Sequence, residues 1–183
     1  WYATDLPRHP CDPAAAAALL ESIGLVDRDG DGVREDGHGA DASFTVLTMK
    51  GNSLLERGAA FVRDALGAIG LRVDVAPLEV GALIDRIERG DYEAVYFRFL
   101  TTDLDPALNM DLWLSSGGAH VWNPLQRTPA TDWEREIDRL MHQQAATLDH
   151  AKRKALFDQV QRIFAEHVPV LQFAAPRIYV ALS

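Results

Sequence analysis

Three segments in the first half of the chain have the hydrophobic pattern of β-strands, and helical patterns separate them. The predicted strands are residues 43–49, 71–75 and 92–100. The two intervening helices run up to Gly70 and Gly90, and glycine suits a helix end because it adopts the left-handed backbone conformation easily. This order and spacing predict right-handed crossovers. We therefore expect an α/β fold whose mostly parallel sheet is flanked by helices.

Capping residues predict where the other helices begin. Asp12, followed by a proline, predicts an Ala-rich helix that ends at Gly24. Residues 53–56 and 131–134 both have the capping-box pattern, in which Ser or Thr and a Glu three residues later exchange hydrogen bonds with the backbone. Asp149 is expected to cap the last helix.

The second half of the chain has the pattern of two amphipathic helices followed by an extended segment. Residues 169–182 form that segment, which can join the sheet. We find no internal repeat or linker and predict one α/β domain over residues 1–183. The predicted buried faces consist of Trp133, Ile137, Leu140, Met141 and Leu148 in the first helix and Leu156, Val160, Ile163 and Phe164 in the second.

Composition excludes some classes of protein. The chain is 48% hydrophobic and 25% charged, with a net charge of −9, which argues against a nucleic-acid surface. No apolar run approaches the ~20 residues of a membrane span. The single cysteine, Cys11, cannot form an internal disulfide and does not identify the compartment. The chain opens on Trp1 without a Met or a leader pattern, so we expect processing or excision from a longer protein.

Residues 27–38 resemble a calcium-binding loop. The residue types suited to positions 1, 3, 5, 6 and 9 of such a loop are Asp27, Asp29, Asp31, Gly32 and Glu35. His38 stands at position 12, where a bidentate Glu should complete the coordination shell. We therefore interpret the segment as a solvated Asp/Gly hairpin and predict no metal site.

Catalytic motifs are incomplete in this sequence. There is no G-x-S-x-G elbow, and the glycine pair after Ser115 and Ser116 lacks the lysine of a phosphate-binding loop. His142 and His150 are eight residues apart without a metal-ligand motif between them. No nucleophile–base pair is visible, so we predict that the chain is not an enzyme and uses no cofactor.

The segment after the third predicted strand is the candidate ligand-binding loop. Ligands of open α/β sheets bind beyond the carboxyl ends of the strands, which is where this segment lies. Its carboxylates, hydroxyls and aromatic neighbour suit a ligand that carries an ammonium group. Asp105 precedes a proline and fits a helix cap, which leaves Asp103 as the carboxylate with less structural use. The predicted ligand-binding residues are Phe99, Thr101, Thr102, Asp103 and Asp105.

Five stretches in one order resemble the C-terminal lobe of the peptide/nickel type (family 5) of extracellular solute-binding protein, which delivers ligands to ABC importers. Together they cover almost the whole chain. They are Asp12-Pro13-Ala14 with Leu19-Leu20, the DRDGDGVRE turn from Asp27, the helix-to-strand step Leu66-Gly67-Ala68-Ile69-Gly70-Leu71-Arg72-Val73, Asp103-Leu104-Asp105-Pro106 with Trp113-Leu114-Ser115-Ser116-Gly117, and RKALFDQVQRIFAEHVP from Arg153. Cys11 stands where the family usually has an aromatic residue, and Phe99 to Thr102 replace its usual tryptophan and small residues.

The resemblance implies one lobe of a periplasmic-binding-protein type II-like fold. It also implies a two-lobed receptor outside the cytoplasm that closes over a peptide or a similar small solute. The implied partners are the solute, the ABC permease subunits and the missing N-terminal lobe, with no nucleic acid. In peptide-binding members an aspartate in the region of Asp103 and Asp105 receives the ligand's α-ammonium group. Free and lipid-anchored forms of the intact protein both remain open.

Two other functions stay open at this point. The first is a metal-binding module, either a nickel receptor or a calcium-loop protein, which a metal titration would separate from a peptide receptor. The second is a hydrolase acting on a small polar substrate. The identity of the solute does not follow from the sequence.

Overall fold

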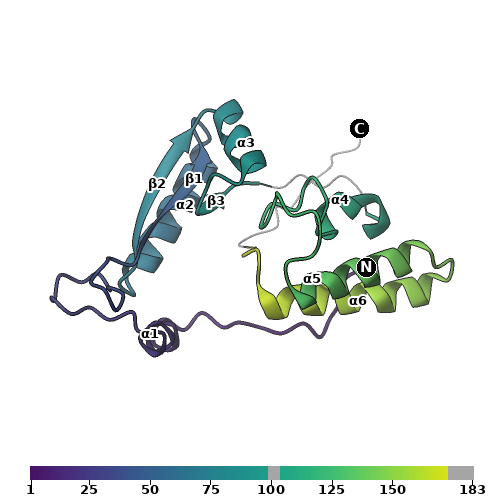
Figure 1. Ribbon diagram of the computed structural model, residues 1–183, viewed down its shortest axis with the longest axis horizontal. Coiled ribbons are helices and arrows are strands. Elements are labelled where there is room, and N and C mark those ends of the chain that lie inside the picture. Colours follow the sequence, from purple (N-terminus) through teal and green to yellow (C-terminus); the bar gives the residue numbers. More distant parts are fainter. Residues whose placement is uncertain (99–103, 173–183) are drawn as a thin grey trace, which may run out of the picture. The chain divides into compact units, whose positions relative to one another are not determined.

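The computed structural model describes residues 1–98 and 104–172, which divide into two compact units (Figure 1). One unit contains residues 9–98, and the other contains residues 1–8 together with 104–172. The single domain expected over residues 1–183 stays a prediction.

The first unit is built around a parallel sheet with the strand order β2-β1-β3. The strands are β1 (Ser43–Met49), β2 (Arg72–Leu78) and β3 (Ala94–Tyr96). The parallel sheet is therefore confirmed. β3 ends earlier than the predicted 92–100, and the final residues of that prediction lie outside the described residues. β2 continues three residues past its predicted end and includes Pro77, which an edge strand tolerates.

Two helices cover this sheet. They are α2 (Ser53–Gly67) and α3 (Val80–Arg89), and each packs against β1. The crossover from β1 to β2 contains α2, and the crossover from β2 to β3 contains α3 and runs in the opposite direction along the sheet. Right-handed crossovers in opposite directions place their helices on opposite faces of the sheet. Val46 and Leu47 of β1 are accordingly both buried, although their side chains point to opposite sides of the strand. The cluster on the α2 side contains Val46, Ala59 and Val73, with Phe44, Leu66, Val75, Ala94 and Tyr96 packed around it.

The start of α2 differs from the prediction. Asn52, not Ser53, caps this helix, and its side chain accepts a hydrogen bond from the Leu55 N–H at 3.2 Å. Glu56 reaches back to the N–H of Gly51 at 2.8 Å. Side-chain capping at this end of α2 is therefore present, but the capping residue is one position earlier than predicted. An Asn side chain caps a helix as well as a Ser side chain does. By contrast, Gly90 ends α3 in the left-handed conformation, as predicted.

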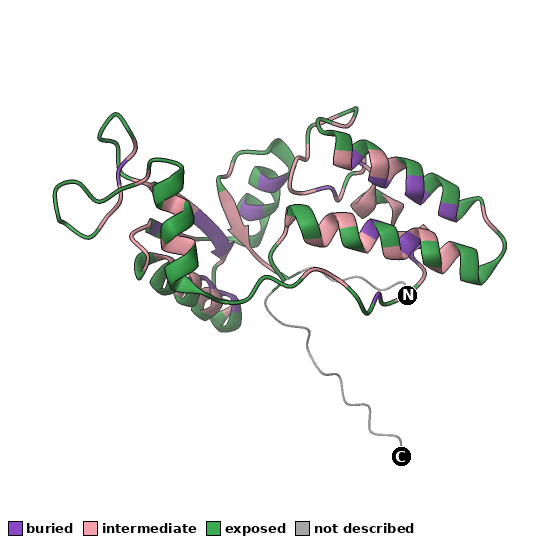
Figure 2. Cartoon of the chain, turned by 90° about the horizontal axis from the view of Figure 1, so that it is seen from below, coloured by how far each residue is buried: buried purple, intermediate pink, exposed green. Residues whose placement is uncertain are grey.

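The helix α1 (Pro13–Ser22) is capped by Asp12 as predicted, and none of its residues is buried (Figure 2). The segment after it forms the expected hairpin-like turn, in which Glu35 bridges to Val26 and to Asp41. Arg34 fixes this segment to the end of α2, because its Nε donates to the Ile69 carbonyl at 2.8 Å.

The second unit is a helical hairpin of α5 (Asp132–Ala145) and α6 (His150–His167). Its buried residues lie along the sides by which the two helices face each other (Figure 2). The shorter η1 (Pro106–Asn109) and α4 (Met110–Trp113) precede this hairpin. The buried core consists of Ile137, Leu140, Met141, Phe157 and Val160, with Trp1, Met110, Trp113, Leu114, Trp133, Leu156, Ile163 and Phe164 packed against it.

Two local predictions for the hairpin are confirmed and one is wrong. Thr131 and Glu134 form the predicted capping box, and Asp149 caps α6 through the Lys152 N–H at 2.8 Å. Leu148 does not belong to the buried face of α5. It lies beyond the end of that helix and is 100% exposed. The prediction was wrong because it applied the helical spacing to a residue that follows the helix.

None of the helices in the described part of the chain combines the length and the apolar character that a membrane span requires.

Candidate ligand-binding site

The predicted ligand-binding loop is described only at its end. Phe99, Thr101, Thr102 and Asp103 lie outside the described residues. Asp105 is described and stands at the start of η1, where its side chain accepts a hydrogen bond from the Ala107 N–H at 2.9 Å. The structure therefore places Asp105 as a cap, and a contact between Asp105 and a ligand stays a prediction.

Asp105 also forms a two-pronged ion pair with Arg153 of α6. Its carboxylate oxygens lie 3.0 Å from Nη1 and 2.5 Å from Nη2 of the guanidinium. The hydrogen bond from Arg153 lowers the pKa of Asp105 and outweighs the opposing effect of burial; the weaker effect of the hydrogen bond from Ala107 also lowers this pKa. Asp105 is thus charged at neutral pH, and both of its oxygens are already engaged.

Arg153 connects four parts of the second unit. Besides Asp105 it contacts Gln144 of α5, whose Oε1 accepts from Nε at 3.0 Å and from Nη2 at 2.9 Å. Its guanidinium carbon lies 5.0 Å from the centre of the Trp1 ring, a cation–π distance. The same arginine therefore joins the start of η1, both helices of the hairpin and the first residue of the chain.

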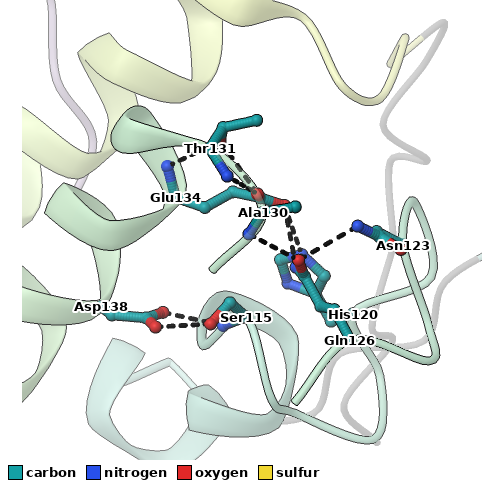
Figure 3. Close-up of polar contacts among 8 residues, drawn as sticks. All are labelled: Ser115, His120, Asn123, Gln126, Ala130, Thr131, Glu134 and Asp138. Atoms are coloured by element: carbon teal, nitrogen blue, oxygen red, sulfur yellow. Dashed lines mark hydrogen bonds and ion pairs between the residues drawn. The ribbon is translucent and has the colours of Figure 1, made fainter. Parts of the chain in front are cut away.

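The loop between α4 and α5 is held at its beginning by Ser115 and Gly117. Ser115 donates from its backbone N–H and its hydroxyl to the two oxygens of Asp138, at 2.7 and 2.5 Å (Figure 3). Gly117 lies so close to the backbone of Asp111 that an added Cβ would stand 2.1 Å from the carbonyl oxygen. The Ser-Gly run therefore forms a close-packed turn, which agrees with the rejection of a phosphate loop there.

A buried polar network holds the end of the same loop (Figure 3). Gln126 is oriented by two donors to its Oε1, the side-chain amide of Asn123 and the Ala130 N–H, each at 3.0 Å. Its Nε2 therefore faces His120 Nε2 and Glu134 Oε1, both at 2.8 Å. An amide nitrogen only donates, so His120 Nε2 is the acceptor and the ring carries its proton on Nδ1.

Glu134 is the charged member of this network and is 3% exposed. Burial raises its pKa, but hydrogen bonds, among them those from the Gln126 amide and from Thr131, outweigh burial, and the net pKa is lowered. The network thus supports the loop between α4 and α5. Through Gln126 it connects Glu134, a member of the α5 capping box, to His120, which lies outside the capping motif.

The acidic segment of the first unit gathers carboxylates on a turn. One oxygen from each of Asp27, Asp29, Asp31 and Glu35 lies within 4.8 Å of the others. Backbone N–H groups of the same turn already donate hydrogen bonds to these carboxylates. Asp27 accepts from Gly30 and Gly32, and Glu35 accepts from Arg28. The hairpin interpretation agrees with these bonds, and the expectation that the loop holds no metal stays a prediction.

Sequence reasoning did not find Arg153, Gln144 or the network of His120. Arg153 opens the resemblance stretch RKAL, but nothing local relates it to Asp105, 48 residues earlier. The only signal for the network was the capping box, which contains Thr131 and Glu134.

The family described as bacterial extracellular solute-binding proteins, family 5 Middle, matches residues 1–120 of the 183. The class of protein is therefore a solute-binding protein. The chain belongs to this family, which confirms the resemblance drawn from its sequence. Proteins of this family are extracellular. They bind solutes rather than transform them, so the prediction that the chain is not an enzyme is confirmed.

Three similar proteins illustrate the likeness. A probable ABC transporter-binding protein of Deinococcus radiodurans is 24% identical over 99% of this chain and 32% of its own length. The di/tripeptide-binding protein 2 of Pseudomonas aeruginosa is 28% identical over 93% of this chain and 29% of its own. The structure of the oligopeptide-binding protein AppA of Bacillus subtilis in complex with a nonapeptide superposes with a TM-score of 0.73 and 25% identity, covering 90% of this chain and 32% of that protein.

The superposition confirms the α/β fold of a periplasmic binding protein of the type II-like class. The chain spans about a third of the length of the relatives it matches.

Proposed function

We propose that the chain is a ligand-binding lobe of the substrate-binding protein of an ABC importer and that it captures peptides or similar small solutes. The observation that carries this proposal is the family match over residues 1–120. Two relatives are named for the di- and tripeptides or the oligopeptides that they bind, which supports peptides as the solute class over the metal-binding alternative.

The proposed ligand contacts are Phe99, Thr101, Thr102 and Asp103, in the segment that follows β3 of the parallel sheet. Solutes of open α/β sheets bind beyond the carboxyl ends of the strands. Asp105 has both oxygens engaged by Arg153 and Ala107. This supports Asp103 as the carboxylate that receives the ammonium group of a peptide, with Asp105 nearby as a weaker candidate.

The partners belong to the same proposal. The remaining part of a longer protein, about twice the length of this chain by comparison with its relatives, would supply the second wall of the site. ABC permease subunits would receive the solute, and a lipid anchor on the intact protein would hold it at the membrane. Partition of the natural protein into a detergent phase tests the anchor.

Native mass spectrometry of the gene product that contains this chain tests the solute class. We expect a retained peptide or a solute of similar size. An enriched divalent cation without an organic solute would favour the metal-binding alternative instead.

Replacing Asp103 tests the assigned carboxylate. A charge-assisted hydrogen bond in a closed site contributes roughly 1.5–3 kcal/mol, so Asp103→Asn should weaken peptide binding about ten- to a hundredfold and leave the melting midpoint nearly unchanged. Calorimetry with one peptide and its N-acetylated form measures this. Equal binding of both forms by the wild type would show that no carboxylate recognises the amino terminus. Loss of affinity in Asp105→Asn alone would assign the ammonium contact to Asp105.

A further inference from the structure

His120 is a buried histidine with two competing neighbours at one ring nitrogen. It is 1% exposed, and its Nε2 lies 2.8 Å from Nε2 of Gln126 and 3.2 Å from Oε1 of Glu134 (Figure 3). The amide nitrogen of Gln126 only donates, so the neutral ring accepts from Gln126. The same ring nitrogen cannot also donate to Glu134. The two contacts therefore belong to different protonation states of His120.

Gln126 is the side chain that a proton on His120 would displace. A protonated ring carries an N–H on Nε2, which would donate to Oε1 of Glu134 and form a charge-assisted hydrogen bond. The amide N–H of Gln126 would then face a second donor at the present distance of 2.8 Å. Because Oε1 of Gln126 accepts from the Asn123 side chain and the Ala130 N–H, each at 3.0 Å, its displacement would free both ends of this loop segment.

Two further donors make the closed loop easier to open. Nδ1 of His120 and Nε1 of Trp122 are buried and have no acceptor in the described part of the chain. The centres of the two rings are 3.8 Å apart. A buried donor without an acceptor costs free energy, which contact with water recovers. Opening of the loop would expose both donors to water, so it would require less free energy than opening of a fully paired loop.

Glu134 is the charged group that faces His120 directly, and it comes from α5. Hydrogen bonds keep its pKa below the usual value despite burial, so it remains an anion while a histidine titrates. Asp138, one turn further along α5, already accepts two hydrogen bonds from the loop after α4. His167 of α6 stacks on the α5 residue that precedes Glu134, and the loop itself contributes the exposed Arg127.

We propose that His120, Gln126 and Glu134 form a pH-sensitive switch that controls residues 121–130. With His120 neutral, the amide of Gln126 donates to both the ring and Glu134, and the loop is closed. With His120 protonated, the ring donates to Glu134, and Gln126 is released together with the loop. The closed loop favours the neutral ring, so its stability is lost as the pH falls. This inference is independent of the proposed function.

Hydrogen exchange on the gene product that contains this chain tests the switch. Protection factors corrected for the intrinsic pH dependence of exchange are compared at pH 8 and pH 5, between which histidines usually change charge. Protection of residues 121–130, which include the Ala130 N–H, should fall on the order of tenfold at pH 5, about the effect of losing one hydrogen bond. Residues 154–163 of α6, in the same unit, should keep their protection.

Two variants identify the titrating group. His120→Gln removes the ring, so protection of residues 121–130 should no longer depend on pH in this interval. His142→Gln is the matched control, because His142 of α5 is exposed and this change removes a histidine from the same unit without touching the network. It should behave like the wild type. If His120→Gln does not fold, nitrogen-15 NMR of wild-type protein labelled at histidine decides, since protonation of His120 and loss of protection must share one midpoint.

Four results would overturn the inference. Protection that is unchanged or higher once His120 is protonated would show that the pair with Glu134 forms without releasing Gln126. A ring that stays neutral down to pH 5 would leave the switch without its trigger. The same pH dependence in His120→Gln as in the wild type would assign the effect to another group. An equal loss of protection in α6 would show that acid destabilises the whole unit and not the loop.

Discussion

At the scale of single residues, the second unit contains carboxylates that each have a defined set of donors. Asp105 accepts hydrogen bonds from Arg153 and Ala107, and Glu134 accepts hydrogen bonds from Gln126 and Thr131. Both have a lowered pKa. In each case the folded structure favours the charged form, because these donors form stronger bonds to a carboxylate than to a carboxylic acid.

Glu134 gives a stability prediction with a defined sign. A pKa that is lower in the folded protein than in the unfolded chain adds stability above the unfolded value, about 4.5, and this stability is lost as the pH falls through the folded pKa. Glu134→Gln should therefore lower the free energy of unfolding at pH 7 by about 1–3 kcal/mol and have less effect at pH 3. Urea denaturation at both pH values measures this.

Glu136 on the same helix is the control for Glu134. Its pKa is lowered by a hydrogen bond from Arg139, but its side chain is 43% exposed. Glu136→Gln should change the free energy of unfolding by less than about 0.5 kcal/mol. An equal effect of the two substitutions would show that burial in the network adds nothing.

At the scale of elements, the turn after α4 depends on a close approach of two backbone segments. A Cβ on Gly117 would meet the carbonyl oxygen, carbonyl carbon and Cα of Asp111, all within 2.8 Å, and backbone cannot move aside as a flexible side chain can. Gly117→Ala should therefore destabilise the protein by about 1–3 kcal/mol, the usual cost of forced overpacking. Thermal melting measures the change.

Gly118 is the matched control for this turn. Nothing lies within 4 Å of a Cβ placed on it, so Gly118→Ala should leave the melting midpoint nearly unchanged. A similar fall for both substitutions would mean that flexibility of the Ser-Gly run, and not the approach to Asp111, determines stability.

At the scale of the whole molecule, the chain covers about a third of the length of its relatives, and this should limit its affinity. A pocket normally buries most of its ligand, and the proposed receptor closes over the solute with two lobes. We expect the isolated chain to fold and to bind peptide only in the millimolar range or more weakly, which corresponds to ~4 kcal/mol or less. Calorimetry on the isolated chain measures it, and submicromolar binding would show that the chain forms a complete site by itself.

The sequence by itself determined the elements whose signals are local. The capping box of Thr131 and Glu134, the Asp149 cap and the left-handed Gly90 each involve residues within four positions of one another. The parallel sheet could also be predicted, because the alternation of strands with helices leaves few topologies. Local signals gave the wrong capping residue where two neighbouring residues could both cap the helix, as Asn52 and Ser53 could at the start of α2.

Only the tertiary structure decided the contacts between distant residues. Asp105 and Arg153 are 48 positions apart and Ser115 and Asp138 are 23 apart, so no spacing rule relates them. The exposure of Leu148 depended on where α5 ends, which a helical period alone does not fix. The same holds for His120, whose proton position follows from a glutamine that is itself oriented by Asn123 and Ala130. These roles depend on which side chains the packed helices and loops bring within hydrogen-bonding distance, and that is a property of the folded chain.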